Sequence, residues 1–301
     1  MKEQRNQTKK AKITKAIYTM RTTPIPTTVK NDMRVSTLGL GLAAMMILTQ
    51  RNAMGSLSTV DLGTDSNFAV LAGSGITVTG PTTITGDIGS FPTPAITGLG
   101  NVTLNGVNQA NDAVTQLAQN DLTTAFNNAA GRPANTSYAG GFDLAGLTLV
   151  SGVYNDSSSL FLSGTLTLDA QGNPNAVWII QAGSTLITAA NSKVNLIDGA
   201  QACHVFWEVG SSATLGTYTD FNGNILALTS ITADTGAIID GRLLAQNGAV
   251  TLDNNTITEA TCSNLMSPVP EATTVFAAMV LLIPLGVTTL RAMRRQRAVC
   301  H

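Results

Sequence analysis

The middle of this chain has very little positive charge. Residues 56–263 contain only three Lys or Arg against fifteen Asp or Glu, whereas residues 1–55 hold ten Lys or Arg and residues 291–297 hold four more. An acidic segment of this kind repels nucleic acid and anionic lipid surfaces, so we expect no nucleic-acid partner. Basic ends beside apolar runs are instead typical of targeting segments.

Residues 56–263 also lack the groupings on which enzymes and metal sites depend. They contain one histidine, His204, and three cations that are far apart in the sequence. Polysaccharide lyases, which occur on stacked β folds, need a base, a cationic stabiliser and often clustered carboxylates for calcium. There is no Gly-x-Ser-x-Gly elbow, no Gly-rich calcium-binding nonapeptide, and no Cys-x-x-Cys or His cluster. We therefore expect no enzymatic activity, no cofactor and no metal site.

Cysteine is scarce as well. Cys203 and Cys262 lie in the middle segment, and Cys300 lies beyond the C-terminal arginines. Two cysteines in an exported domain favour one disulfide that closes a loop of about 60 residues, which contributes roughly 4 kcal/mol if it acts through chain entropy. Two buried free thiols are the alternative. His204 follows Cys203 and precedes apolar residues, so we interpret it as a structural side chain near the disulfide.

Long apolar runs are confined to the two ends. The first, at 38–48, follows a basic segment and precedes a small-x-small cleavage site after Gly55. At 1.5 Å per residue it is too short to span the ~30 Å hydrocarbon core of a membrane, which favours a signal peptide over an anchor. We therefore predict that residues 1–55 are an N-terminal extension and signal peptide, with Met33 as an alternative start.

The second apolar run, at 273–290, is followed by an arginine cluster and is long enough to cross a membrane. Just before it, Val269-Pro270-Glu271-Ala272 resembles the bacterial PEP-CTERM sorting signal, although the second proline of the usual Pro-Glu-Pro is missing. The resemblance implies removal of the tail by exosortase-type sorting machinery; a plain C-terminal anchor is the alternative. We predict a linker with the sorting motif at 264–274 and a transmembrane span with a basic tail at 275–301. The protein would then be exported, and either secreted or held at the cell surface or in the extracellular matrix, with at most a transient membrane anchor.

The middle segment is rich in short runs that alternate apolar residues with Thr or Gly. These runs lie at 56–107 and 142–262 and are interrupted by Gly, Asn or Asp, which indicates β-strands. The stretches 222–236 and 240–255 repeat one pattern at an offset of 18 to 19 residues. Such a period predicts a β-solenoid, in which each coil stacks on the next. A β-sandwich is the competing fold.

One segment differs from these strands. Residues 108–130 lack Gly and Pro, and their apolar residues recur every three to four positions, so they predict an amphipathic helix that ends at Gly131 and Pro133. A single helix can bury its apolar stripe only against the β part. The stripe consists of Val114, Leu117, Leu122, Ala125, Phe126 and Ala129.

Threonine recurs at matching positions of the repeats. A small or β-branched residue precedes a Thr, and a second Thr or Asn follows three positions later. If the coils stack in this register, equivalent Thr point outward about 4.7–4.9 Å apart. Residues i and i+3 do not share a face of a regular strand, so the first Thr of each pair is the better candidate. A merely solvated surface is the alternative, because Thr is common in strands. The candidate pairs are Thr79 and Thr82, Thr188 and Asn191, Thr214 and Thr217, Thr232 and Thr235, and Thr251 and Asn254.

Several linked motifs are similar, in order, to those of the ice-binding-protein-like family of bacteria, fungi and algae. They are FAVLAGSGIT, VFWEVGSSATLGT, FNGNILALTSIT and GRLLAQNGAVTLDNNTI, and the resemblance covers about 61–262, within a predicted domain at 56–263. It implies a mainly β fold, namely a discontinuous right-handed β-solenoid of triangular cross-section with one long α-helix packed alongside. It also implies adsorption to the surface of an ice crystal, which inhibits ice growth and recrystallisation.

Some members of that family carry a Thr-Ala/Gly-x-Thr/Asn motif that contacts ice. The stretches that begin at Thr79, Thr188 and Thr232 fit this motif, whereas those at Thr214 and Thr251 have Leu in the second position. The resemblance therefore implies that the Thr pairs contact the ice crystal, and we expect the protein to act as a monomer.

An exported cell-surface or matrix adhesin, a rigid solenoid without ice affinity, is the alternative function. Trp178, Trp207, Tyr154 and Tyr218 are the aromatic residues that a sugar-binding surface could use. The two Trp lie inside apolar runs, however, which favours packing in the core.

Overall fold

The computed structural model describes residues 57–110 and 112–263. The predicted signal peptide, the alternative start at Met33, the sorting motif, the C-terminal span and Cys300 lie outside the described residues. Within the described part of the chain, no helix is long and apolar enough to cross a membrane.

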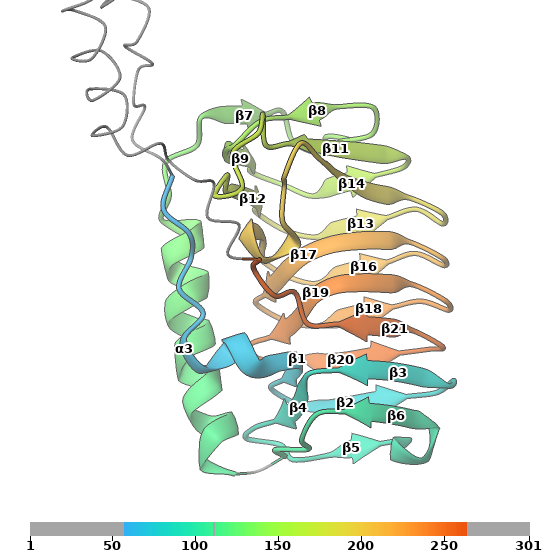
Figure 1. Ribbon diagram of the computed structural model, residues 1–301. Helices are drawn as coiled ribbons and strands as arrows, with labels where there is room; N and C mark the ends of the chain where they lie inside the picture. The colour runs from blue at the N-terminus through green and yellow to red at the C-terminus, as the bar shows by residue number, and fades with distance from the viewer. Residues whose placement is uncertain (1–56, 111, 264–301) are drawn as a thin grey trace, which may run out of the picture. The chain divides into compact units, whose positions relative to one another are not determined.

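These residues form parallel β-strands that stack in successive coils, with one α-helix packed alongside (Figure 1). The strands lie in three stacks, which we call stack A, stack B and stack C. Stack A contains β7 (Thr136–Tyr138), β9 (Gly152–Asp156), β12 (Trp178–Ala182), β15 (Val205–Val209), the second halves of β17 (Asp220–Ala227) and β19 (Ile238–Ala245), β1 (Phe68–Ala72) and β4 (Asp87–Ser90). Stack B contains β10 (Leu160–Leu162), β13 (Leu186–Thr188), β16 (Ala213–Leu215), β18 (Ile231–Ala233), β20 (Ala249–Leu252), β2 (Gly75–Val78) and β5 (Ile96–Thr97). Stack C contains β8 (Thr148–Leu149), β11 (Thr165–Asp169), β14 (Lys193–Ile197), the first halves of β17 and β19, β21 (Thr256–Thr258), β3 (Thr82–Thr85) and β6 (Val102–Asn105).

Two long strands join stacks A and C into one 14-stranded sheet. Gly223 in β17 and Gly241 in β19 stand where these strands pass from stack C to stack A, and both have positive φ. A Cβ atom on Gly241 would lie 1.9 Å from the carbonyl oxygen of Gly223. Only glycine therefore allows the two coils to approach this closely at the bend.

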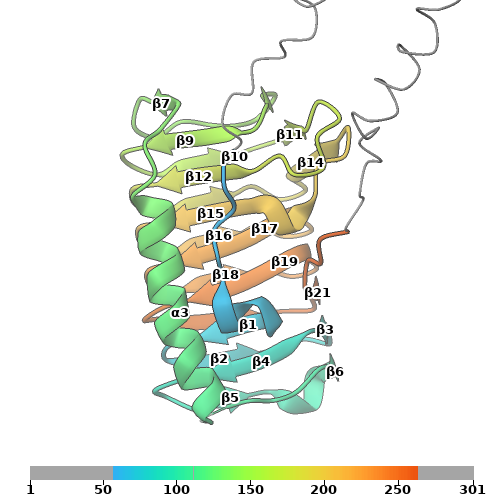
Figure 2. The same ribbon diagram turned by 60° about the vertical axis from the view of Figure 1, so that its left-hand side comes forward.

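The order of the coils in space differs from their order in the chain. β1 pairs with β19, β2 with β20, and β3 with β21, so the two N-terminal coils lie beyond the last coil. Helix α3 (Ala113–Ala130) then runs along stack A and returns the chain to β7 at the opposite end (Figure 2). The prediction of a mainly β fold with one helix is confirmed. A β-sandwich does not fit, because its sheets are antiparallel whereas the pairing here is parallel.

Helix α3 is shorter than predicted and uses a different stripe at its start. It begins at Ala113 rather than at 108, because the Asp112 side chain accepts a hydrogen bond from the Thr115 N–H at 2.9 Å and caps the helix. Val114 and Leu117 are 41% and 50% exposed, so their assignment to the buried stripe was wrong. The side chains that pack on stack A are mostly small, which brings the helix close to the strands: Ala118, Leu122, Ala125 and Ala129.

The interior of the coils is mainly apolar. Trp178 and Trp207 are fully buried there, and each indole N–H donates to a backbone oxygen at 3.1 Å, that of Leu149 for Trp178 and that of Asn222 for Trp207. The prediction that both Trp belong to the core is confirmed. Tyr154 is also buried and donates to the Val150 oxygen at 2.8 Å.

The predicted disulfide between Cys203 and Cys262 is confirmed, with 5.5 Å between the two Cα atoms. Cys203 lies in the short 3-10 helix η3 (Ala202–His204), and Cys262 lies just after the last strand. His204 has Nδ1 3.2 Å from the Pro174 oxygen and Nε2 3.4 Å from the Cys262 sulfur. Its position matches the predicted structural role beside the disulfide.

Candidate functional site

One outward column of threonines runs along stack B. The strand register pairs Thr97 with Thr77, Thr77 with Thr251, Thr251 with Thr232, and Thr232 with Thr214. Adjacent parallel strands lie about 4.7–4.9 Å apart, so these five residues repeat at that spacing. We call them the stack B column. Ile187 and Phe161 continue the same line beyond Thr214.

The alternation of each strand turns these hydroxyls outward. In β2, for example, Ile76 and Val78 are buried in the core whereas Thr77 between them is exposed. The Thr97 hydroxyl lies 3.3 Å from the Thr77 hydroxyl, which links neighbouring rungs of the column. Among the described residues no strand of stack B contains a charged side chain, so the strands themselves present uncharged groups outward. Asp234 and Asp253 lie in the turns directly after β18 and β20.

Thr188 does not belong to this column, and its predicted register was wrong by one residue. Ile187, not Thr188, is the partner of Thr214. Thr188 is 3% exposed; its hydroxyl lies 2.9 Å from that of Thr219 and accepts from the Gly216 N–H at 2.9 Å. The register is fixed by Leu186, which would turn into solvent if the strand slipped by one residue.

The predictions for Thr79 and Thr82 also fail on register. Thr77 occupies the column, whereas Thr79 follows β2 and donates from both its N–H and its hydroxyl to the Leu252 oxygen. Thr82 is 2% exposed and its hydroxyl donates to the Gly80 oxygen at 3.0 Å. The apolar alternation Ile-Thr-Val around Thr77, and Ile-Thr before Gly98, was the signal that could have identified Thr77 and Thr97.

The second residue of each predicted pair lies at the turn after stack B. Asn191 and Asn254 have φ of 59° and 54°. Asn is favoured there because it tolerates the left-handed region better than most residues. Backbone hydrogen bonds align Asn191 with Tyr218 rather than with Thr217. Thr217 and Thr235 therefore share one turn position and the two Asn share the next, and the Thr235 hydroxyl donates to the Asp253 carboxylate. None of these four residues joins the column, and Tyr218 stands exposed at the same turn.

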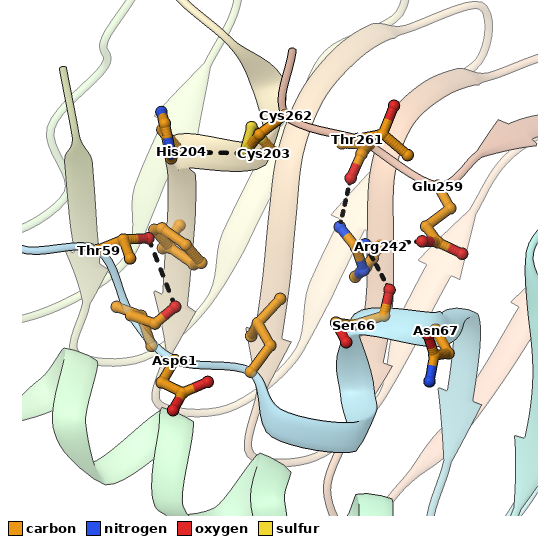
Figure 3. A pocket seen from close by; sticks show the side chains of 14 residues that line it. Thr59, Asp61, Ser66, Asn67, Cys203, His204, Arg242, Glu259, Thr261 and Cys262 are labelled. Atoms are coloured by element: carbon orange, nitrogen blue, oxygen red, sulfur yellow. Dashed lines mark hydrogen bonds and ion pairs between the residues drawn. A yellow bond between two sulfur atoms is a disulfide. The ribbon is translucent and has the colours of Figure 1, made fainter. Parts of the chain in front are cut away.

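A cleft of about 670 Å³ lies on the side of stack A (Figure 3). Asp61, His204, Arg242 and Glu259 contribute to its lining. The Arg242 guanidinium is buried and donates to the Ser66 oxygen at 2.6 Å, to Asn224 Oδ1 at 2.9 Å and to Glu259 at 3.0 Å. Burial raises the pKa of Glu259, and Arg242 opposes that rise. Arg242 therefore cross-links β19 to Ser66 of the N-terminal segment, to Asn224 of the neighbouring coil and to Glu259 after the last strand.

The two carboxyl groups with the largest pKa shifts lie away from stack B. Burial, reinforced by Asp121, raises the pKa of Asp65 to about 8. Burial raises the pKa of Glu208 to about 7. Asp65 lies in the 3-10 helix η1 (Gly63–Asn67), and Glu208 lies in β15 on the same side as Phe206, which packs under α3. Both shifts follow from packing against the helix side of the molecule.

Comparisons with known proteins identify similar sequences and structures. Residues 70–258 match the model of the family described as ice-binding-like. A protein of Nostoc sp. (strain HG1), named an ice-binding protein, is 52% identical over 200 residues, which are 66% of this chain and 74% of that protein.

Two solved structures are similar over the same region. The ice-binding protein from an Antarctic biological consortium is 47% identical with a TM-score of 0.66, over 67% of this chain and 92% of its own. The ice-binding protein of the Antarctic ascomycete Antarctomyces psychrotrophicus is 44% identical with a TM-score of 0.66, over 68% of this chain and 100% of its own. The mainly β architecture with parallel sheets and one helix is thus shared with these proteins.

Proposed function

Because this chain belongs to the ice-binding-like family, we propose that it adsorbs to ice and thereby inhibits ice growth and recrystallisation. The relatives named as ice-binding proteins support this function over that of an exported adhesin without ice affinity. The proposal assigns the contact to stack B. Stack A is excluded as the contact surface, because α3 covers its outward side.

The single observation that carries the assignment is the stack B column of Thr97, Thr77, Thr251, Thr232 and Thr214. Each rung presents one hydroxyl and one methyl group at the same spacing, on strands without charged side chains. Water held by such an array can take an ordered arrangement that merges with the crystal. The contacts are individually weak but numerous, and the stacked strands are already rigid, so little entropy is lost on binding.

The apolar end of the column extends this surface. Ile187 and Phe161 follow Thr214 in register and are partly exposed. Water next to apolar groups is ordered without being bound, so these two side chains fit the same contact. The proposed site therefore keeps Thr214, Thr232 and Thr251 from the predicted set, adds Thr77 and Thr97, and leaves out the buried Thr82 and Thr188.

Several finer properties remain part of the proposal. We propose that the three stacks close a right-handed coil of triangular cross-section, that residues 56–263 are the exported domain, and that the protein acts as a monomer. Export through the signal peptide and recognition of the tail by exosortase-type machinery agree with the Cys203–Cys262 disulfide, because disulfides persist in oxidising compartments.

The substitution Thr232→Tyr tests the assignment, because Thr232 lies near the middle of the column. A bulky ring there would hold the ice front away from the neighbouring rungs. We expect thermal hysteresis of the full chain to fall sharply, while the far-UV circular dichroism spectrum stays unchanged.

The matched control is Thr124→Tyr, which introduces the same ring at an exposed threonine of α3. Full hysteresis is expected for this variant. Hysteresis that is undiminished in Thr232→Tyr would remove stack B as the contact surface. Exclusion of the unsubstituted protein from a slowly growing ice hemisphere would overturn the function itself and favour the adhesin.

A further inference from the structure

Stack C carries a second outward array of threonines at one end of the molecule. In β3, Thr83 and Thr85 are exposed on either side of the buried Ile84. β21 repeats the arrangement with Thr256 and Thr258 around the buried Ile257. In β6, Thr103 and Asn105 take the same places. Figure 1 shows these three strands as consecutive rungs at the end of stack C that contains the N-terminal coils.

The strand register aligns the six side chains in two columns. Thr256 pairs with Thr83, which pairs with Thr103; Thr258 pairs with Thr85, which pairs with Asn105. Rungs are about 4.7–4.9 Å apart, and the two columns are about 6.6 Å apart, because a parallel strand advances about 3.3 Å per residue. The stack B column repeats in one direction only, whereas this array repeats in two. We call it the stack C grid.

In the next coils the same two columns no longer consist of uncharged Thr and Asn side chains. Ile238 and Asp240 follow Thr256 and Thr258 in register. Asp220 and Lys193 come next and form an exposed ion pair at 2.6 Å. The outward surface of these neighbouring coils therefore carries charged side chains, which bind liquid-like water strongly. The grid differs because its six outward side chains are uncharged.

Asp240, in the rung next to Thr258, is exposed and bounds the grid on that side. Two other carboxylates beside the grid are held by other partners. Glu259, the residue after Thr258, is paired with Arg242 at 3.0 Å. Asp87 accepts from the Val107 N–H at 2.8 Å and from the Gln109 side chain at 3.1 Å. Within the grid, the Asn105 amide lies 3.5 Å from the Thr85 hydroxyl. The six outward positions thus present amide, hydroxyl and methyl groups on a rigid backbone.

From this geometry we propose that the stack C grid is a second ice-contacting surface, which adsorbs to an ice plane other than the plane bound by stack B. The inference rests on the proposed function, since it assumes that uncharged Thr arrays of this chain bind ice. Stacks B and C face different directions, and the grid adds a second repeat to the rung spacing that the two arrays share, so we expect the two arrays to match different crystal planes.

The test measures which planes of a single ice crystal the fluorescently labelled full chain covers. Thr83→Tyr places a ring in the middle rung of the grid, and Thr165→Tyr is the matched control, because Thr165 lies in the same outward column at the charged end of stack C. We expect Thr83→Tyr to lose adsorption to one ice plane and keep adsorption to another, and Thr232→Tyr to show the reverse. The double variant should adsorb to no plane, and Thr165→Tyr should adsorb to the same planes as the unsubstituted protein. Unchanged melting temperatures establish that each variant is folded.

The outcomes separate this inference from the proposed function. A plane pattern that is unaffected by Thr83→Tyr, or complete loss of adsorption in Thr232→Tyr alone, overturns the second surface and leaves the stack B assignment in place. Full adsorption by the double variant overturns both assigned surfaces. Failure of the unsubstituted protein to adsorb overturns the proposed function, and the second surface with it.

Discussion

At the scale of single residues, the sequence identifies threonines but not which way they point. Leu186-Ile187-Thr188 and Ala213-Thr214-Leu215 each contain a Thr, yet the first is turned inward and the second outward. Aligning the repeats on their threonines therefore placed Thr188 beside Thr214, where the strand register has Ile187. The shift could not be foreseen, because the inward Thr188 is tolerated only by the hydroxyl of Thr219 and the N–H of Gly216, which come from the next coil.

This difference predicts opposite effects for the same substitution. Thr188→Val removes a buried hydroxyl and leaves the Gly216 N–H without its acceptor, which costs about 1–3 kcal/mol of unfolding free energy. Thr214→Val, the control, removes a hydroxyl that faces solvent, so its unfolding free energy should change little. Thermal or urea denaturation of the two variants measures the difference. Equal destabilisation would contradict the assigned register.

At the scale of elements, the helix was predictable in kind but not in detail. The absence of Gly and Pro and the apolar spacing identified it, and Gly131 ends it as predicted. Which side chains of the helix face stack A depends on the hydrogen-bond partners that they find there. Gln119 is buried because its amide reaches the Ala245 oxygen at 3.4 Å, and Thr115 is buried because its hydroxyl donates to the Gln109 oxygen. Neither partner can be read from the helix sequence.

The packing of the helix on stack A also predicts a pH dependence of stability. Glu208 is 6% exposed beneath α3, and burial raises its pKa from 4.5 to about 7. A carboxyl whose pKa is raised by folding favours the folded state below pH 4.5, and that contribution is lost as the pH rises to about 7. At pH 8 the folded protein holds an ionised carboxylate with little solvent around it.

Glu208→Gln keeps the shape of the side chain and removes this ionisation. We expect the variant to be more stable than the unsubstituted protein by roughly 1–3 kcal/mol at pH 8, with a smaller difference at pH 4.5. The measurement is the melting temperature across this range. Asp198→Asn, at an exposed turn, serves as the control and should leave the pH profile unchanged. A Glu208→Gln profile that runs parallel to that of the unsubstituted protein would show that Glu208 is not the titrating group.

At the scale of the whole molecule, the repeats predicted stacked coils but could not give their order. Val70 pairs with Leu243, and Thr77 pairs with Thr251, across almost the full length of the described chain. Every coil has similar apolar edges, so local patterns do not specify which one receives the N-terminal coils. The consequence reaches the site, because this stacking places Thr77 and Thr97 in line with Thr251 and extends the stack B column from three threonine rungs to five.

The Cys203–Cys262 disulfide acts at this same scale, since it ties the segment after the last strand to the middle of the stack. It lies beside the cleft on the side of stack A and contacts neither the stack B column nor the stack C grid.

Replacing both cysteines by serine should therefore lower the unfolding free energy by about 4 kcal/mol, the contribution expected for a loop of this length. Near 0 °C the variant should stay folded and keep its thermal hysteresis. Added reductant should lower the melting temperature of the unsubstituted protein and leave that of the double variant unchanged. Loss of hysteresis in a variant that is still folded would show that the ice-contacting surfaces depend on the disulfide. That result would contradict the assigned surfaces, since both lie apart from the disulfide.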